Sequence, residues 1–222
     1  MNTELTLKDA ETAVDLQAYL QRAKKLDQDG MVRLRAFGEI LAAYVAPIFA
    51  GSLMDSGPTV FGLRTCELAE PTEVDVVVPI AAILDRLARI VDSGATRKKD
   101  LTIDLPPSVR TPWAGISPPR VGWQEAGTIS ESFLTRVAKE GIAEVATTIP
   151  SSAGGPIAAR IRGEIWGRAV DLDSGVPAGA AFVAAGLGFL TENEEVGLYS
   201  VDGWVRLSAA HGHVLARVAT HR

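Results

Sequence analysis

The chain has 222 residues, enough for one large domain or two small ones, and it can bury roughly 70% of its unfolded surface without a disulfide or a metal. Its 22 basic and 27 acidic residues leave a formal net charge of −5, so bulk charge does not draw it to phosphate backbones. The hydrophobic share of 47% is too high for a disordered chain.

The cysteine content and the N-terminus predict a cytoplasmic protein. The single cysteine, Cys66, cannot form an internal disulfide, which fits a reducing compartment. The first residues have neither the basic nor the apolar region of a signal peptide. The longest uncharged run, between Asp173 and Glu192, is shorter than the ~20 apolar residues of a membrane helix and contains Pro177, so we assign it to the core.

The first half of the chain predicts two helices and an antiparallel sheet. Apolar residues at helical spacing indicate a helix over 10–26, which Gly30 ends. Strands separated by turn residues follow, and we expect them to pair with their sequence neighbours as a meander: 32–36, 40–48, 59–68 and 73–78. Pro79 then begins a helix whose apolar stripe covers one sheet face: Ile80, Ile83, Leu84, Leu87 and Val91.

The second half begins with a segment rich in proline and tryptophan. Five prolines between Pro106 and Gly127 exclude a regular helix, and Trp113 and Trp123 indicate an ordered, extended strap. Three helices follow, over 130–147, from Pro156 and from Pro177, and then a hairpin of strands 196–201 and 204–218.

The predicted fold class is α+β. An antiparallel β-meander with covering helices precedes a helical unit that ends in a β-hairpin, which is the element order of a winged helix. We expect domain boundaries at 1–105, 106–128 (the strap) and 129–222, with one integrated domain as the alternative.

Three groups of residues carry a resemblance that extends over the whole chain. They are Leu26-Asp27 with Met31 to Arg35; Leu105-Pro106-Pro107 with Trp113, Pro118-Pro119 and Gly122-Trp123; and Val176-Pro177 to Phe189-Leu190 with Gly203-Trp204. In these positions the chain resembles a family of actinobacterial cytosolic proteins of unassigned function. The resemblance implies an actinobacterial, cytoplasmic protein and carries over no catalytic or binding residue.

His211 and His213 are the candidate metal ligands. Residues two apart on a strand point to the same face, so both imidazoles could bind one ion. A zinc or iron site needs a third ligand, for which the candidates are Asp202 and Glu195 from the facing strand. No H-E-x-x-H or C-x-x-C motif and no further internal histidine supports such a site. Such a site predicts a metal-dependent hydrolase or isomerase. The alternative is two partly exposed histidines on a terminal hairpin.

Cys66 is the candidate nucleophile. The neighbouring Arg64 could lower the pKa of its thiol and favour the reactive thiolate. Neither histidine is near in sequence, however, and a lone cysteine is more often a small buried apolar residue. No G-x-S-x-G motif marks a nucleophilic serine. The sequence therefore assigns no catalytic residue and no cofactor, and it favours a protein that is not an enzyme.

A winged-helix arrangement would make the helix from Pro177 the DNA-reading element. Residues 177–186 contain no Arg, Lys, Asn or Gln, so nothing there can bond a base edge or a phosphate. Small residues such as Gly179 instead predict a tightly packed helix. Nucleic acid is therefore not an expected partner, and a DNA-binding regulator remains the third hypothesis.

The leading interpretation is a non-catalytic cytoplasmic protein that binds a small molecule or another protein, with a homodimer as a candidate assembly. It rests on the scarcity of the polar clusters that chemistry requires. The last part of the chain is interpreted as a packing element, with Trp204 anchoring the hairpin and four side chains buried: Phe182, Leu187, Phe189 and Leu190.

Overall fold

The computed structural model describes residues 4–50, 57–94, 101–150, 152–171 and 173–217. Its helices and antiparallel strands confirm the predicted α+β class. The chain divides into two compact units, which are described separately. Unit 1 consists of Met1–Val45 with Leu63–Ala114, and unit 2 consists of Ala46–Gly62 with Gly115–Arg222. Two strands contribute residues to both units: β3 (Ile40–Ile48) and β4 (Thr59–Glu67).

Unit 1 holds the strand order β5-β2-β3-β4 and a separate two-stranded sheet of β1 and β6. Its elements, besides β3 and β4, are β1 (Glu4–Thr6), α1 (Ala10–Leu26), β2 (Met31–Phe37), β5 (Val74–Pro79), α2 (Ile80–Asp92), β6 (Thr102–Asp104) and the short 3-10 helix η2 (Pro112–Gly115).

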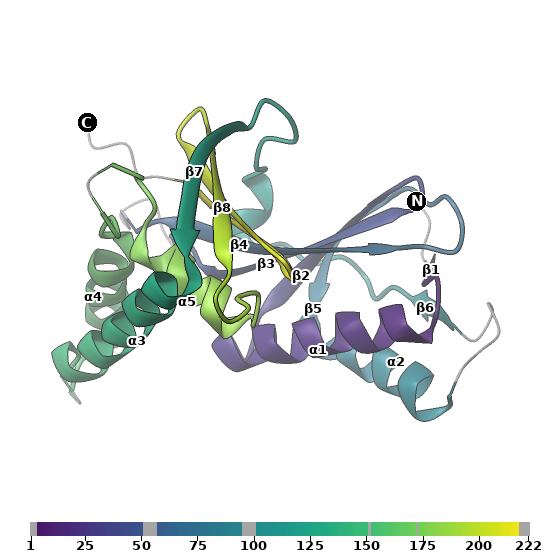
Figure 1. The fold of residues 1–222 in the computed structure, drawn as a ribbon. Helices are drawn as coiled ribbons and strands as arrows, with labels where there is room; N and C mark the ends of the chain where they lie inside the picture. The colour runs from purple at the N-terminus through teal and green to yellow at the C-terminus, as the bar shows by residue number, and fades with distance from the viewer. Residues whose placement is uncertain (1–3, 51–56, 95–100, 151, 172, 218–222) are drawn as a thin grey trace. The chain divides into compact units, whose positions relative to one another are not determined.

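Helices α1 and α2 pack against each other (Figure 1). Ile80, Ile83 and Leu87 of the predicted α2 stripe are buried, whereas Leu84 and Val91 are only partly buried. Helix α1 begins after Asp9, whose carboxylate accepts a hydrogen bond from the backbone N–H of Thr12 at 2.8 Å. The hydroxyl of Tyr19 donates to the carbonyl oxygen of Ala43 on β3 at 3.1 Å. The side chains that form the helix side of the core are Ala13, Leu16, Tyr19, Leu20 and Ala23 of α1 and Ile80, Ile83, Leu87 and Ile90 of α2.

The predicted meander is wrong at its fourth strand, because β5 pairs with β2 and not with β4. In unit 2 the other neighbour of β4 is β10, so β4 has no free edge for β5. The free edge of β2 accepts it instead. The new pairing aligns Arg33 with Val77 and Arg35 with Asp75, and it places the Arg33 guanidinium on the Asp75 carboxylate at 2.7 and 2.8 Å.

Among the described residues, unit 2 holds the strand order β4-β10-β9-β8-β7, in which β10 to β7 pair antiparallel, and three helices. Its elements are β7 (Gln124–Ser130), α3 (Glu131–Thr148), α4 (Gly155–Gly167), α5 (Ala178–Gly186), β8 (Glu195–Val201), β9 (Trp204–Ala209) and β10 (Gly212–Arg217).

The predicted winged-helix order is wrong. A turn at Ala210 and His211 divides the expected last strand into β9 and β10, so the end of the chain is a three-stranded meander. Strand β7 begins inside the predicted strap, extends two residues beyond it and joins the same sheet beside β8 (Figure 1). The three helices therefore lie between β7 and β8 in the sequence, although these two strands are neighbours in the sheet.

Helix α5 is the close-packed element that its small residues predict. A Cβ on Gly179 would lie 2.8 Å from the Cδ1 of Ile48 and 3.1 Å from the main-chain oxygen of Trp166. The Trp166 ring stacks on Phe182 with 4.5 Å between ring centres. Helix α5 cannot serve as a DNA-reading helix, because most of its residues are buried. They are Ala178, Gly179, Ala180, Ala181, Val183 and Ala184.

The burial predictions for the end of the chain hold in part. Leu187 and Phe189 are buried as expected, whereas Phe182 and Leu190 are only partly buried. Trp204 is buried and stacks on Phe61. Across the residues that the structure describes, no helix is both long and apolar enough to cross a membrane.

Candidate functional site

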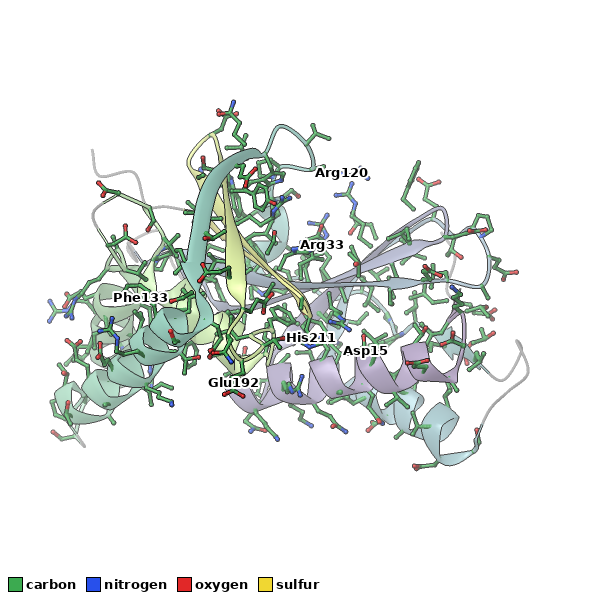
Figure 2. All side chains as sticks on the ribbon, viewed as in Figure 1. Asp15, Arg33, Arg120, Phe133, Glu192 and His211 are labelled. Carbon is green, nitrogen blue, oxygen red and sulfur yellow. The ribbon has the colours of Figure 1, made fainter. Side chains whose placement is uncertain are left out.

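The two candidate metal ligands do not share a strand face. His211 lies exposed in the turn between β9 and β10, where Figure 2 labels it, and His213 lies on β10. Of the suggested third ligands, Glu195 accepts a hydrogen bond from the Thr128 hydroxyl at 2.9 Å, and Asp202 occupies the β8–β9 turn. Within the described parts of the chain, no group of three His, Cys, Asp or Glu residues could hold a metal ion. A metal site at His211 and His213 stays a prediction.

His213 instead contacts Ser208, its paired residue on β9. The Nδ1 of His213 lies 3.1 Å from the Oγ of Ser208. Burial, and then the charge of Arg206, lowers the pKa of His213, which keeps the imidazole neutral at neutral pH. A hydrolytic serine–histidine pair also requires a group that orients the imidazole. No carboxylate among the described residues hydrogen-bonds to His213, so the pair is a cross-strand contact.

Cys66 lies on β4, where burial affects the thiol more than the nearby ion pair of Arg64 and Asp15 does. The guanidinium of Arg64 binds the carboxylate of Asp15 at 2.6 and 2.8 Å. Burial, followed by the charge of Asp15, raises the pKa of Cys66 to about 12, against the opposing effect of Arg64. The thiol is therefore protonated at neutral pH, and the predicted activation by Arg64 is outweighed.

The structure brings together a second group of side chains on the sheet of unit 2. The guanidinium carbon of Arg206 on β9 lies 4.3 Å from the ring centre of Tyr199 and 4.8 Å from the ring centre of Trp123. Tyr199 is the residue of β8 directly opposite Arg206, and Trp123 immediately precedes β7. We call Trp123, Tyr199 and Arg206 the arginine cage.

Local sequence explains how the cage is held. Trp123 donates its indole N–H to the carbonyl oxygen of Pro119 at 3.1 Å, which fixes the ring. A Cβ on Gly197 would lie 3.1 Å from the Tyr199 ring, so glycine gives this ring room. The alternation of buried Val205 and Leu207 with Arg206 was the available sequence signal, but it does not reveal which rings cover the arginine.

Two solved structures share the fold. "Caulobacter crescentus pol III beta" is 12% identical over 99% of this chain, and the "DNA polymerase sliding clamp from Caulobacter crescentus" is 13% identical over 100% of it; the TM-score is 0.53 for each. The chain spans 66% of the length of both clamp chains, just under two thirds. Identity this low establishes the likeness of fold alone.

The sequence comparisons divide the chain near the predicted strap. No curated protein matches. One family model, the Domain of unknown function (DUF8185), matches residues 118–221, and another, the Domain of unknown function (DUF8010), matches residues 1–115. The actinobacterial origin implied by the resemblance stays a prediction. Because the second model covers more than half of its length, the chain belongs to the family described as Domain of unknown function (DUF8010).

Proposed function

We propose that the protein is a non-catalytic interaction protein that assembles with further copies of itself and, in that form, binds partner proteins. One observation carries the proposal: the fold extends over 99–100% of the chain in "Caulobacter crescentus pol III beta" and in the "DNA polymerase sliding clamp from Caulobacter crescentus". Both names connect that fold with a polymerase, which favours an interaction role for this chain. We place the function in the cytoplasm, on the sequence features alone.

The edge of the unit 2 sheet supports self-association. Strand β7 has one neighbour in the sheet, β8, and residues 124–128 are exposed. In the described part of the chain, no other main-chain hydrogen bond engages the backbone of β7. An open edge presents unpaired N–H and C=O groups that a second strand can bind.

The edge of the unit 1 sheet offers a contrast. On β5, the N–H of Val109 donates to the carbonyl oxygen of Val77 at 2.8 Å, and the N–H of Val77 donates to the hydroxyl of Ser108 at 3.1 Å. Residues of the predicted strap thus cover that edge. Covering one edge is a common protection against unwanted pairing, so β7 is the better candidate for an assembly contact.

DNA binding is the second candidate, and it is favoured by the same likeness, because the shared fold occurs in a DNA polymerase clamp. The expectation that nucleic acid is not a partner therefore draws no support from the comparisons. Against DNA binding stands the net charge of −5. A winged-helix regulator is not proposed, because its reading helix would be the buried α5.

The test is the molar mass of the purified protein across a concentration series, compared with the Ala126→Lys variant. Ala126 is the exposed bulge residue of β7 and has no paired residue on β8. A lysine there places a charge on the edge and should dissociate the assembly. Ala146→Lys, at an exposed position of α3, is the matched control. DNA binding is tested alongside by titrating duplex DNA at low and high salt, since phosphate contacts weaken steeply with salt.

A further inference from the structure

We propose that the arginine cage binds a carboxylate of an acidic segment of a partner protein, with Arg206 as the residue that contacts it. The inference rests on the proposed function and names the chemistry of the partner. It concerns a face of the unit 2 sheet that is distinct from the β7 backbone edge, so the two can fail separately.

The cage holds its arginine in one orientation. Aromatic rings lie near the guanidinium at 4.3 and 4.8 Å, distances at which a cation is attracted to the ring faces. The Trp123 ring is held by its hydrogen bond to Pro119, and the Tyr199 ring lies over Gly197, which has no side chain to displace it. A side chain that is already ordered loses little entropy when it binds a ligand.

The charge of Arg206 is uncompensated within the described residues. Its Nε is buried without a hydrogen-bond partner, and neither an ion pair nor a hydrogen bond joins Arg206 to another described side chain. The two terminal nitrogens are not buried in this way. A guanidinium with two free terminal nitrogens matches the two oxygens of a carboxylate.

Partial burial of the Arg206 charge costs desolvation free energy, which a bound anion would offset. Burial lowers the pKa of Arg206, and the nearby Tyr199 opposes this effect. No carboxylate among the described residues contributes. Since a half-buried cation without a counter-ion is unfavourable, an incoming anion gains more here than at an exposed arginine.

The surroundings favour a single carboxylate over a run of phosphates. His213 lies on the same face but is neutral at neutral pH, because its pKa is lowered. Glu125, aligned with Tyr199, adds a negative charge to the face. Nucleic acid requires a row of cations along its backbone, whereas the cage offers one guanidinium fork. The exposed Val121 nearby suits an apolar neighbour of the carboxylate in a peptide.

The test is fluorescence anisotropy of labelled hexaglutamate with the full-length protein. Arg206→Gln removes the cation and should weaken binding by at least about tenfold. Arg136→Gln is the matched control, since Arg136 also lies over an aromatic ring, Phe133, at 5.1 Å, but it is paired with Glu140 at 3.6 Å. Its substitution should leave hexaglutamate binding unchanged, and hexaglutamine should not bind.

Three results would overturn the inference: no hexaglutamate binding by the wild type, equal losses in the two variants, or displacement of hexaglutamate by oligothymidylate through Arg206, which would assign the site to phosphate. If Arg206→Gln does not fold, the indole N–H resonance of Trp123 in the wild-type protein decides, because bound hexaglutamate should shift it and hexaglutamine should not. A wild-type protein that self-associates but does not bind hexaglutamate refutes this inference alone, whereas a wild-type protein that stays monomeric refutes the proposed function.

Discussion

Gly179 of α5 lies against Trp166 of α4 so closely that a Cβ at position 179 would be 3.1 Å from the main-chain oxygen and 3.2 Å from the Cβ of Trp166. The same Cβ would be 2.8 Å from Ile48 on β3. A backbone oxygen cannot rotate away as a side chain can. The absence of a side chain at Gly179 is therefore what lets α5 approach its neighbours.

The first prediction concerns this contact. Gly179→Ala should destabilise the protein by about 1–3 kcal/mol, because the added methyl overfills a closed space despite its better helix propensity. Gly115→Ala, at the end of η2 where nothing lies within 4 Å of the added Cβ, is the control and should be neutral or slightly stabilising. Urea denaturation of both variants measures the difference. Equal stability of the two variants would contradict the described packing of α5.

The second prediction concerns the Arg33–Asp75 pair of unit 1. The hydrogen bonds from Arg33 lower the pKa of Asp75, partly offset by burial. A depressed carboxylate pKa stabilises the fold above its unfolded value of about 3.9, and this contribution is lost as the pH falls through the folded pKa. Asp75→Asn should therefore cost about 1 kcal/mol at pH 7, a modest value because Asp75 is 41% exposed, and should flatten the acid dependence of stability.

Asp85→Asn is the control for that pair, since Asp85 is exposed on α2 and has no ion pair in the described residues. Its stability should match that of the wild type between pH 3 and 7. A similar acid profile for both aspartate variants would show that the Arg33–Asp75 pair contributes nothing measurable.

The third prediction concerns Cys66 and alkaline pH. Its folded pKa of about 12 exceeds the unfolded value of about 8.5, so the protonated thiol favours the fold below pH 8.5 and this contribution is lost as the pH rises toward 12. Cys66→Ala should lose less stability than the wild type over this window. Tyr19, whose pKa burial also raises, keeps a slope in both proteins. Identical slopes in thermal denaturation from pH 8 to 11 would contradict the assignment.

The fourth prediction uses the same thiol as a kinetic probe. Iodoacetamide reacts with thiolate, so the folded protein should be alkylated much more slowly at pH 8 than the protein in denaturant. Mass spectrometry follows the modification of Cys66, the single cysteine of the chain. A folded-state rate equal to or above the denatured rate would contradict the raised pKa of the Cys66 thiol.

The sequence predicted those helices and strands in which apolar residues recur at the spacing of the buried face. The alternation from Val32 to Ala36 and the stripe from Ile80 to Leu87 appear in the structure as a strand and a helix with those faces inward. Strand β7 was missed because it lies at an edge with exposed residues, so no apolar alternation marks it, and prolines precede it. Gly212, next to the turn that divides the last strand, is the residue in the sequence that could have indicated the division. In the structure a Cβ at this position would lie 2.5 Å from the Phe189 ring.

The sequence could not predict the features that depend on pairing between distant strands. Neighbouring strands in the sequence usually pair, but β5 lies beside β2, which brings Arg33 to Asp75. The arginine cage joins residues from the segment before β7, from β8 and from β9, so no spacing in the sequence identifies it. The histidine pair could be found as a motif, but its geometry depended on a turn.

The molar mass of the protein in solution tests the central claim most directly. Sedimentation equilibrium over a wide concentration range should give a mass above the 23.5 kDa of one chain, and Ala126→Lys should return it to that value while Ala146→Lys does not. A wild-type protein that remains at 23.5 kDa throughout would contradict the proposal that this clamp-like fold works by assembly through β7.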